Sequence, residues 1–226
     1  MKLLHHMWRY GKMEVVEIFR SIQGEGDLIG KPAIFIRFAG CNLDCPFCDE
    51  SDKYYLKTEM KPKEIHDKVK EYYTGKEMIV ITGGEPFLQN LDELEELIGL
   101  LKHEYFIAIE TNGTIKNIFI QGNWVTVSPK PPKYDINLLW LNEIKLVVNK
   151  ETVNEVKNFL ISYSSPVKWM DFVLPVKPSI WLQPDSNDMK TNCQSIITLI
   201  NNHNLMTSSF YNLKAGIQLH KIYNIL

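Results

Sequence analysis

The chain has 226 residues, enough to bury one sizeable hydrophobic core, and its composition shows no break between two folding units. Apolar residues make up 45% of it and charged residues 23%, which is typical of a soluble globular protein and excludes a disordered or fibrous chain. The 25 basic and 27 acidic residues are dispersed and give a formal net charge of -2, which argues against direct nucleic-acid binding, and no apolar run approaches the ~20 residues of a membrane span.

Strand-like and helix-like segments alternate along the chain after an N-terminal extension that we expect over residues 1–12. Runs rich in β-branched and aromatic residues predict strands, and apolar residues at helical spacing predict helices. In chain order these are strands Met13–Phe19 and Ala33–Phe38, helix Lys63–Tyr73, strand Met78–Thr82, helix Leu91–Lys102, strands Phe106–Glu110, Trp124–Ser128 and Glu143–Val148, helix Thr152–Leu160, strands near Phe172 and Trp181, and helix Met189–Asn201. Asn90 can cap the second helix, with Glu93 three residues later as in a capping box.

This alternation predicts an α/β fold in which a mostly parallel sheet carries its helices on the outside. About six strands are too few for a closed eight-stranded barrel, so we expect an open partial barrel of the (βα)6 type, formed by one domain over residues 13–226. Five polar or glycine-rich segments follow predicted strands: Cys41–Cys48, Gly83–Pro86, Glu110–Gly113, Ser128–Lys130 and Gln183–Pro184. Because the carboxyl ends of parallel strands share one edge, where ligands gather, these segments predict a single site.

Three of the four cysteines lie on one short segment, as Cys41, Cys45 and Cys48, whereas Cys193 lies far away. An extracellular disulfide framework distributes an even set of cysteines over the fold, so this pattern favours a reducing cytoplasm. A structural zinc site usually has four protein ligands, and no second cysteine pair or histidine pair follows. Three thiolates suit a 4Fe-4S cluster that leaves one iron open to a ligand, with zinc and inert thiols as the alternatives.

The cysteine segment and one glycine-rich segment resemble a known superfamily. The cysteine spacing, with Phe47 before the last thiol, is similar to the radical S-adenosylmethionine (SAM) signature, and Thr82–Pro86 resembles the second motif of that superfamily. A glycine pair after a strand lets the backbone approach the methionine moiety of SAM closely. Further segments resemble the 7-carboxy-7-deazaguanine synthase family: Phe19–Gly26, Gly30–Ala33, Arg37–Cys41, Glu110–Thr114, Ser128–Lys130, Gln183–Pro184 and Gln218–Lys221. The resemblance leaves out the first dozen residues and a stretch around Tyr134–Trp140.

The resemblance implies a partial barrel of the radical SAM kind and a lyase that uses a 4Fe-4S cluster, SAM and Mg²⁺. Its implied substrate is 6-carboxy-5,6,7,8-tetrahydropterin, whose ring is contracted by radical chemistry, with loss of ammonia, to 7-carboxy-7-deazaguanine. In such an enzyme the cofactor performs the difficult chemistry, and the protein positions and shields it. The product serves the synthesis of queuosine-type nucleosides. The resemblance also implies a homodimer and a flavodoxin-type electron donor.

The resemblance assigns roles to residues at matching positions. The residues implied to hold the cluster are Cys41, Cys45 and Cys48. The residues implied to bind SAM are Phe47, Cys48, Asp49, Gly84, Glu85, Ser128, Pro129, Lys130 and Gln183. The residues implied to bind the pterin are Ile22, Gln23, Gly24, Arg37, Thr82, Gln218 and His220. Simpler structural explanations are a glycine turn at Gln23 and Gly24, an outward strand residue at Arg37, a capped loop at Ser128–Lys130 and a structural histidine at position 220.

Three of these roles have a stated chemistry. Glu85 and nearby carbonyl groups are expected to receive the ammonium group of SAM, and Arg37 to pair with the substrate carboxylate through its planar guanidinium. The sequence departs from the family at Glu50, where the family has a threonine whose hydroxyl contacts Mg²⁺. A carboxylate is a natural Mg²⁺ ligand, so Glu50 is predicted to hold the ion; the alternatives are Ser51 as the ligand or no ion.

Two other functions fit part of the pattern. Another small radical SAM protein, such as an activase that makes a glycyl radical on a partner, would share the cysteine segment, but Gln23–Gly26 and Gln218–Lys221 argue against it. A zinc-stabilised binding module without catalysis would explain the thiols alone. Metal content after anaerobic purification distinguishes the two, because the module contains zinc and no iron.

Overall fold

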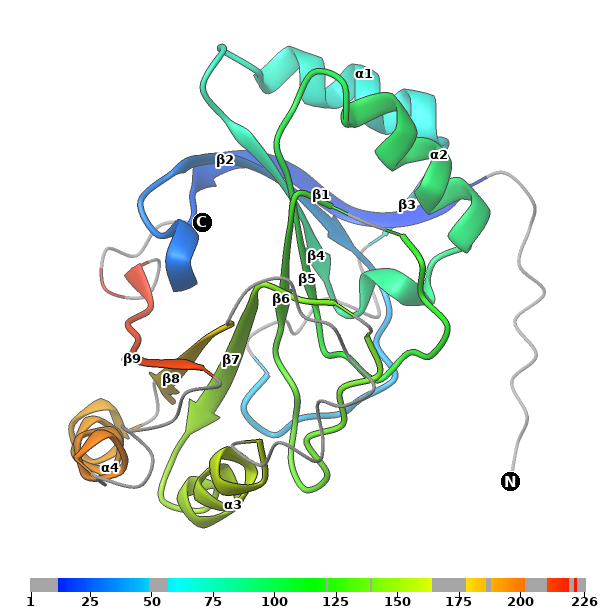
Figure 1. Ribbon diagram of the computed structural model, residues 1–226. Helices are drawn as coiled ribbons and strands as arrows, with labels where there is room; N and C mark the ends of the chain where they lie inside the picture. The colour runs from blue at the N-terminus through cyan, green and yellow to red at the C-terminus, as the bar shows by residue number, and fades with distance from the viewer. Residues whose placement is uncertain are drawn as a thin grey trace.

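The computed structural model describes residues 12–48, 57–120, 122–138, 140–163, 178–185, 188–201 and 211–219, together with Ile222. The strands of this part of the chain form one sheet in the order β3-β1-β2-β4-β5-β6-β7-β8-β9 (Figure 1). Their bounds are β1 Met13–Ile22, β2 Pro32–Phe38, β3 Thr58–Met60, β4 Met78–Gly83, β5 Ile107–Thr111, β6 Trp124–Val127, β7 Glu143–Val148, β8 Ser179–Pro184 and β9 Asn212–Ala215. The helices are α1 Pro62–Tyr72, α2 Leu91–Leu101, α3 Val153–Tyr163 and α4 Met189–Ile200, with short 3-10 turns η1 Gly26–Leu28 and η2 Pro86–Leu88.

Every neighbouring pair from β2 to β9 is parallel, and only β1 runs antiparallel to its neighbours β2 and β3. The two edge strands, β3 and β9, do not pair with each other, so the sheet stays open. The predicted α/β class with an open, mostly parallel sheet is therefore confirmed. The strand predicted near Phe172 lies outside the described residues, as do residues 1–11 of the expected extension.

The four helices lie in two pairs. In Figure 1, α1 and α2 lie together beside the first half of the sheet, and α3 and α4 lie beside β7 and β8. Pro62 starts α1, and the carboxylate of Glu64 accepts the backbone N–H of Lys61 at 2.7 Å. The side chain of Asn90 caps α2 as predicted, because it accepts the N–H groups of Asp92 and Glu93. Among the described residues no helix is long and apolar enough to cross a membrane.

Strict alternation of strands and helices fails in the middle of the chain. The described parts of the connections from β5 to β6 and from β6 to β7 contain no helix. Their apolar side chains enter the main core instead, where Ile118, Tyr134, Leu138 and Leu141 are buried. These loops therefore cover the sheet here, between three strands that the sequence predicts in succession without a helix.

The two faces of the sheet bury different sets of side chains. The main core lies between the sheet and the helices and includes Ile34 and Ile79, both fully buried. A smaller apolar cluster on the opposite, inner face contains Ala33, Met78 and Val80. Side chains alternate between the two faces along a strand, so every second residue belongs to the inner face. Beyond the apolar cluster, the inner face carries a second set of side chains. That set is polar and comprises Arg37, Thr82, Glu110, Thr126, Ser128, Glu143, Lys145 and Gln183.

Candidate active site

The three clustered cysteines lie on the loop that follows β2, at the carboxyl edge of the sheet. This loop is joined to the glycine-rich loop after β4 by backbone hydrogen bonds from Gly84 N to Phe38 O (3.1 Å) and from Glu85 N to Gly40 O (2.9 Å). A Cβ atom added at Gly84 would collide with the carbonyl oxygen of Gly40 and would lie only 2.6 Å from its carbonyl carbon. Glycine at position 84 is therefore what allows the two loops to touch.

The thiols themselves are accessible. Cys48 is exposed, Cys41 and Cys45 are half-buried, and the Cys48 N–H donates to the Cys45 carbonyl at 3.0 Å, which folds the loop into a turn. Within the described residues no three Cys, His, Asp or Glu side chains are already gathered in a metal-ligand arrangement. Three soft thiols on one accessible loop, beside a backbone that approaches closely at Gly84, nevertheless form a donor set that fits a 4Fe-4S cluster with one open iron.

Glu85 fixes the loops after β4 and β5 to each other. Its fully buried carboxylate accepts the Thr111 hydroxyl (2.7 Å), the Asn112 N–H (2.7 Å) and the Phe87 N–H (3.1 Å). Burial raises the pKa of Glu85, against the effect of these donors. The structure thus gives Glu85 a role in holding the two loops together, and its expected contact with the ammonium group of SAM stays a prediction. Both carboxylate oxygens are already bonded, and the side chain does not reach the surface.

Three residues expected to bind SAM converge from the cysteine loop and from the loop after β6. Lys130 Nζ donates to Ser128 Oγ at 2.6 Å and lies 5.9 Å from the centre of the Phe47 ring. The hydroxyl of Ser128 in turn donates to the Lys145 carbonyl oxygen at 3.1 Å. A cation, a hydroxyl and an aromatic ring therefore lie together beside the thiols.

The inner face carries a network of partly buried charges centred on the buried Lys145. Its ammonium group lies 2.7 Å from Glu25 Oε2 and 3.3 Å from Glu110 Oε1. Glu110 also accepts the Gln23 amide (3.1 Å) and the Thr82 hydroxyl (3.1 Å). Burial lowers the pKa of Lys145, but the surrounding carboxylates raise it by more, so the net shift is upward. Gln23 and Thr82, both expected to contact the substrate, are thus joined through a carboxylate.

The turn that carries Gln23 and Glu25 follows β1 and is held from two sides. The Gly24 carbonyl accepts the Leu219 N–H at 3.0 Å, and Glu25 Oε1 accepts the Gln218 amide at 2.8 Å. These two contacts bring the segment after β9 onto the turn. Gln218 therefore lies beside the turn that carries Gln23, whereas Ile22 pairs with Pro32 at the amino end of β2.

Beneath this turn lies Glu143, which is 2% exposed and accepts the Asp27 N–H at 2.6 Å and the Thr126 hydroxyl at 3.2 Å. Gly26 has a φ of +69°, and a Cβ atom there would collide with the Glu143 carboxylate. Burial raises the pKa of Glu143 to about 7, despite the opposing effect of Lys145. Asp27 accepts the Trp181 indole N–H at 3.0 Å and pairs with Lys214. The turn is thus tied to β7, β8 and β9.

Arg37 is the neighbour of Thr82 across the pairing of β2 with β4. Its Nε donates to Glu17 at 2.7 Å, and its guanidinium carbon lies 5.4 Å from the centre of the Phe19 ring. The side chain is 25% exposed, so the guanidinium is oriented from β1 but still accessible. The simpler alternative for Arg37 was an outward strand residue, whereas here the side chain is held by Glu17 and is mostly covered.

Gln183 places a buried acceptor at the end of β8. The residue is 3% exposed, and its Oε1 has no hydrogen-bond partner within the described part of the chain. A buried acceptor of this kind normally has a donor, which a bound molecule can provide. The remaining expected site residues, Asp49, Glu50 and His220, lie outside the described residues, as does Ser51.

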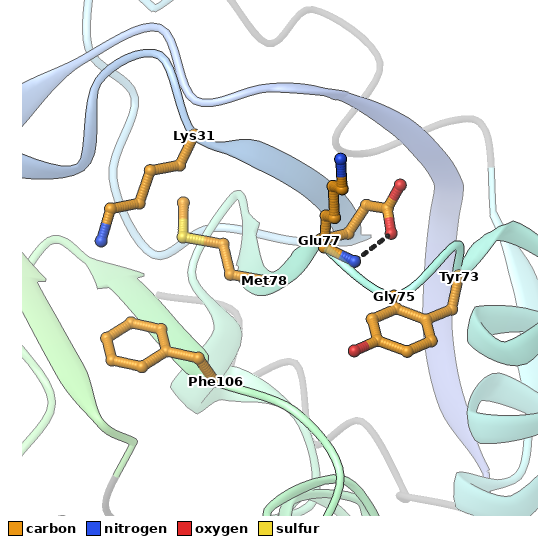
Figure 2. Close-up of a pocket in the computed structure, with 7 residues that line it drawn as sticks. Lys31, Tyr73, Gly75, Glu77, Met78 and Phe106 are labelled. Atoms are coloured by element: carbon orange, nitrogen blue, oxygen red, sulfur yellow. Dashed lines mark hydrogen bonds between the residues drawn. The ribbon is translucent and has the colours of Figure 1, made fainter.

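A cavity of about 320 Å³ lies at the opposite edge of the sheet, and Figure 2 shows the residues that line it. It is lined by Lys31, Met78 and Phe106, which lie at the amino ends of β2, β4 and β5. Glu77 in its wall is already bonded to Thr74 and to Arg20. This cavity is therefore separate from the site at the carboxyl edge, and its buried carboxylate has protein partners.

Sequence reasoning missed the role of three residues. Glu25 and Glu110 lie inside the recognised segments without an assigned role, and Lys145 received none. The signal for Lys145 is its position in the strand Glu143–Val148, where Glu143 and Lys145 fall on one face of an otherwise apolar run. A charged pair on one face of a buried strand indicates a polar interior rather than a packed core.

Comparisons with known proteins agree with this geometry. The family model of the Radical SAM superfamily matches residues 35–159. A 7-carboxy-7-deazaguanine synthase from Haemophilus influenzae is 32% identical over 216 residues, which cover 93% of this chain and 93% of that protein. Another from Aquifex aeolicus is 41% identical over 150 residues, covering 62% of this chain and 67% of that protein. The crystal structure of QueE from Escherichia coli matches with a TM-score of 0.68 at 25% identity, over 92% of this chain and 95% of that one.

Proposed function

Since the chain belongs to the radical SAM superfamily and, within it, to the 7-carboxy-7-deazaguanine synthase family, we propose that it converts 6-carboxy-5,6,7,8-tetrahydropterin to 7-carboxy-7-deazaguanine with loss of ammonia. The observation that carries the proposal is the continuity of two sites along β4. Thr82 lies on the polar inner face, and Gly84, two residues later, touches the cysteine loop. A cofactor at the thiols and a substrate on the inner face are therefore neighbours.

The donor set supports a 4Fe-4S cluster held by Cys41, Cys45 and Cys48, with SAM on its open iron. When bound, this cofactor pair would supply the radical chemistry for taking a hydrogen atom from the substrate, while the residues of the inner face hold the pterin beside it. We assign the SAM ammonium group to Glu85 and to backbone carbonyls of the glycine-rich loop, which Glu85 also holds in place through Thr111 and Asn112. Lys130 provides a cation for the SAM carboxylate.

The inner face supports recognition of a pterin. The 2-amino-4-oxo edge of that ring offers two N–H donors, which match the two oxygens of a carboxylate such as Glu110, and Gln23 adds an amide beside it. Arg37, on the strand next to Thr82, is assigned to the substrate carboxylate through its planar guanidinium. The orphan oxygen of Gln183 is assigned to a donor on SAM or on the substrate.

The remaining features of the proposed function come from the family resemblance. We propose that the enzyme uses Mg²⁺ and that Glu50 would hold the ion, because a carboxylate is a hard anionic ligand suited to it. We further propose that the enzyme acts in the cytoplasm as a homodimer and receives electrons from a flavodoxin-type donor. Clustered thiols that are not arranged as a disulfide framework support the reducing compartment.

The first experiment is anaerobic incubation of the purified protein with SAM, a strong reductant and the carboxytetrahydropterin, with and without Mg²⁺. We expect the 7-deazaguanine product, and iron and sulfide near four per chain, since one 4Fe-4S cluster is bound. Cys41→Ala should lose both the iron and the turnover. Cys193→Ala is the matched control and should keep both, because that thiol lies on α4, away from the loop. Zinc without iron in the wild type would contradict the proposed function. Turnover that does not depend on Mg²⁺ would contradict the proposed use of that ion.

A further inference from the structure

We propose that Lys145 is a positioning residue of the substrate pocket, whose ammonium group holds Glu25 and Glu110 as one fixed pair of acceptors for the N–H donors of the substrate ring. This inference rests on the proposed function, because the pterin is the ligand that the pair is taken to bind. Lys145 lies on β7. The hydrogen bonds of its ammonium group described above go to Glu25 and Glu110, and not to the cysteine loop or to Arg37.

The two carboxylates reach the same ammonium group from different parts of the fold. Glu25 comes from the turn after β1 and Glu110 from β5, and Lys145 Nζ lies 2.7 and 3.3 Å from their oxygens. Two carboxylates this close to one point repel each other strongly in a partly desolvated site. The cation between them removes that repulsion, so both can remain ionised in one arrangement.

The remaining bonds of the pair show which group is presented to a ligand. Glu25 is additionally fixed by Gln218, and Glu110 by Gln23 and Thr82. The side chain of Lys145 is only 9% exposed, against 15% for Glu25 and 22% for Glu110. The carboxylates are therefore more accessible than the ammonium group behind them, so Lys145 acts through them.

The charge balance favours a ligand edge rich in donors. One ammonium group faces two carboxylates, which leaves one excess negative charge, and Glu143 lies on the same strand. A ring edge with two N–H groups offsets this excess, whereas an anionic edge would add to it. If the salt bridges of Lys145 only stabilised the fold, their charge would not favour a ligand edge rich in N–H donors.

Three variants separate the positioning role from a structural one. Lys145→Met keeps the length and loses the charge, and Lys145→Arg keeps the charge. Lys214→Met is the matched control, because Lys214 also anchors the same turn, through Asp27, without touching the carboxylate pair. For each variant the measurements are the iron content, the thermal midpoint, KM and kcat for the pterin, and equilibrium dialysis of the pterin with the iron-loaded protein.

We expect Lys145→Met to raise both the KM and the dissociation constant of the pterin by at least about tenfold, with iron content unchanged, because the acceptor pair is lost while the thiols are untouched. Lys145→Arg should retain most of the affinity. The double variant Lys145→Met with Glu25→Gln should recover part of it, because it restores the charge balance. Lys214→Met should leave the pterin affinity unchanged.

Three results would overturn the proposal, and they are distinguishable from failure of the proposed function. If the Lys145→Met protein is active with a wild-type KM, Lys145 does not position the substrate. Equal losses of affinity in Lys145→Met and Lys214→Met would mean that anchoring the turn is what matters. A fall in iron content and thermal midpoint without a change in the KM of the remaining active protein indicates a structural salt bridge. If the wild type neither binds nor converts the pterin, the proposed function fails, and this inference fails with it.

Discussion

At the scale of single residues, the site depends on side chains whose geometry is set by a neighbour rather than by the ligand. Arg37 illustrates this, since its guanidinium is held by Glu17 and lies over Phe19 before any substrate is present. Less rotamer freedom is then lost when a carboxylate binds. The same arrangement recurs at Glu110, which is held by Gln23 from the turn after β1 and by Thr82 from β4.

Arg37→Lys should therefore raise the KM for the pterin by about tenfold and leave SAM cleavage without substrate unchanged, since a point-charge ammonium cannot form two parallel hydrogen bonds to a carboxylate. Steady-state kinetics and the rate of 5'-deoxyadenosine release in the absence of pterin measure the two effects. An equal loss of SAM binding would place Arg37 on the cofactor instead.

At the scale of elements, the contact between the loops after β2 and β4 is the feature that most directly supports the cofactor site. Gly84→Ala should reduce iron incorporation and SAM binding severalfold, because a methyl group there meets the backbone of Gly40, which cannot move aside as a side chain can. Gly99→Ala is the matched control. A Cβ atom at Gly99 meets nothing within 4 Å, and in α2 alanine stabilises by about 0.5–1 kcal/mol relative to glycine. Normal iron content in Gly84→Ala would contradict this account.

The sequence predicts most of the elements but misses those whose pattern is weak. Strands β4 to β8 are apolar or alternate clearly, whereas β3 and β9 are three and four residues long and contain charged residues. Edge strands of this kind are formed by pairing, not by local propensity. The sequence predicts no helix around β6, and it does not reveal that these loops cover the core, because their buried residues have no regular period.

The site was predictable to a similar degree. The thiols, the glycine pair and several substrate residues could be assigned because each lies in a recognisable segment. The role of Lys145 could be predicted only in part, since two charged residues on one face of β7 indicate a polar interior but not which groups the ammonium meets. Its carboxylate partners follow only from the packing of β7 against the turn after β1.

At the scale of the whole molecule, the inner face makes stability depend on pH through Glu143. Burial raises the pKa of Glu143 from 4.5 to about 7 in the folded protein. A carboxyl group whose pKa is raised by folding contributes stability fully below pH 4.5 and loses it as the pH rises through about 7. The total change is roughly 3 kcal/mol, from 1.4 kcal/mol for each pKa unit.

Glu143→Gln should flatten this dependence, because the amide oxygen can still accept the Asp27 N–H but the group no longer titrates. Thermal midpoints of both proteins at pH 5.5, 6.5, 7.5 and 8.5 should separate, with the wild type falling more steeply. Parallel curves would show that Glu143 is ionised at a normal pKa, and that the polar inner face is more hydrated than its burial indicates.

The turn after β1 also has a consequence for how the enzyme acquires its pocket. Glu25 is held by Lys145 and by Gln218, which are 120 and 193 positions away along the chain. Contacts of such separation form only after long loops have closed, so they belong to the late stages of folding. The cysteine loop and its glycine partner, in contrast, lie within one early stretch of the chain. The part that binds the reactive cofactor can thus assemble before the part that selects the substrate, and an incompletely folded chain would carry the radical chemistry without its target.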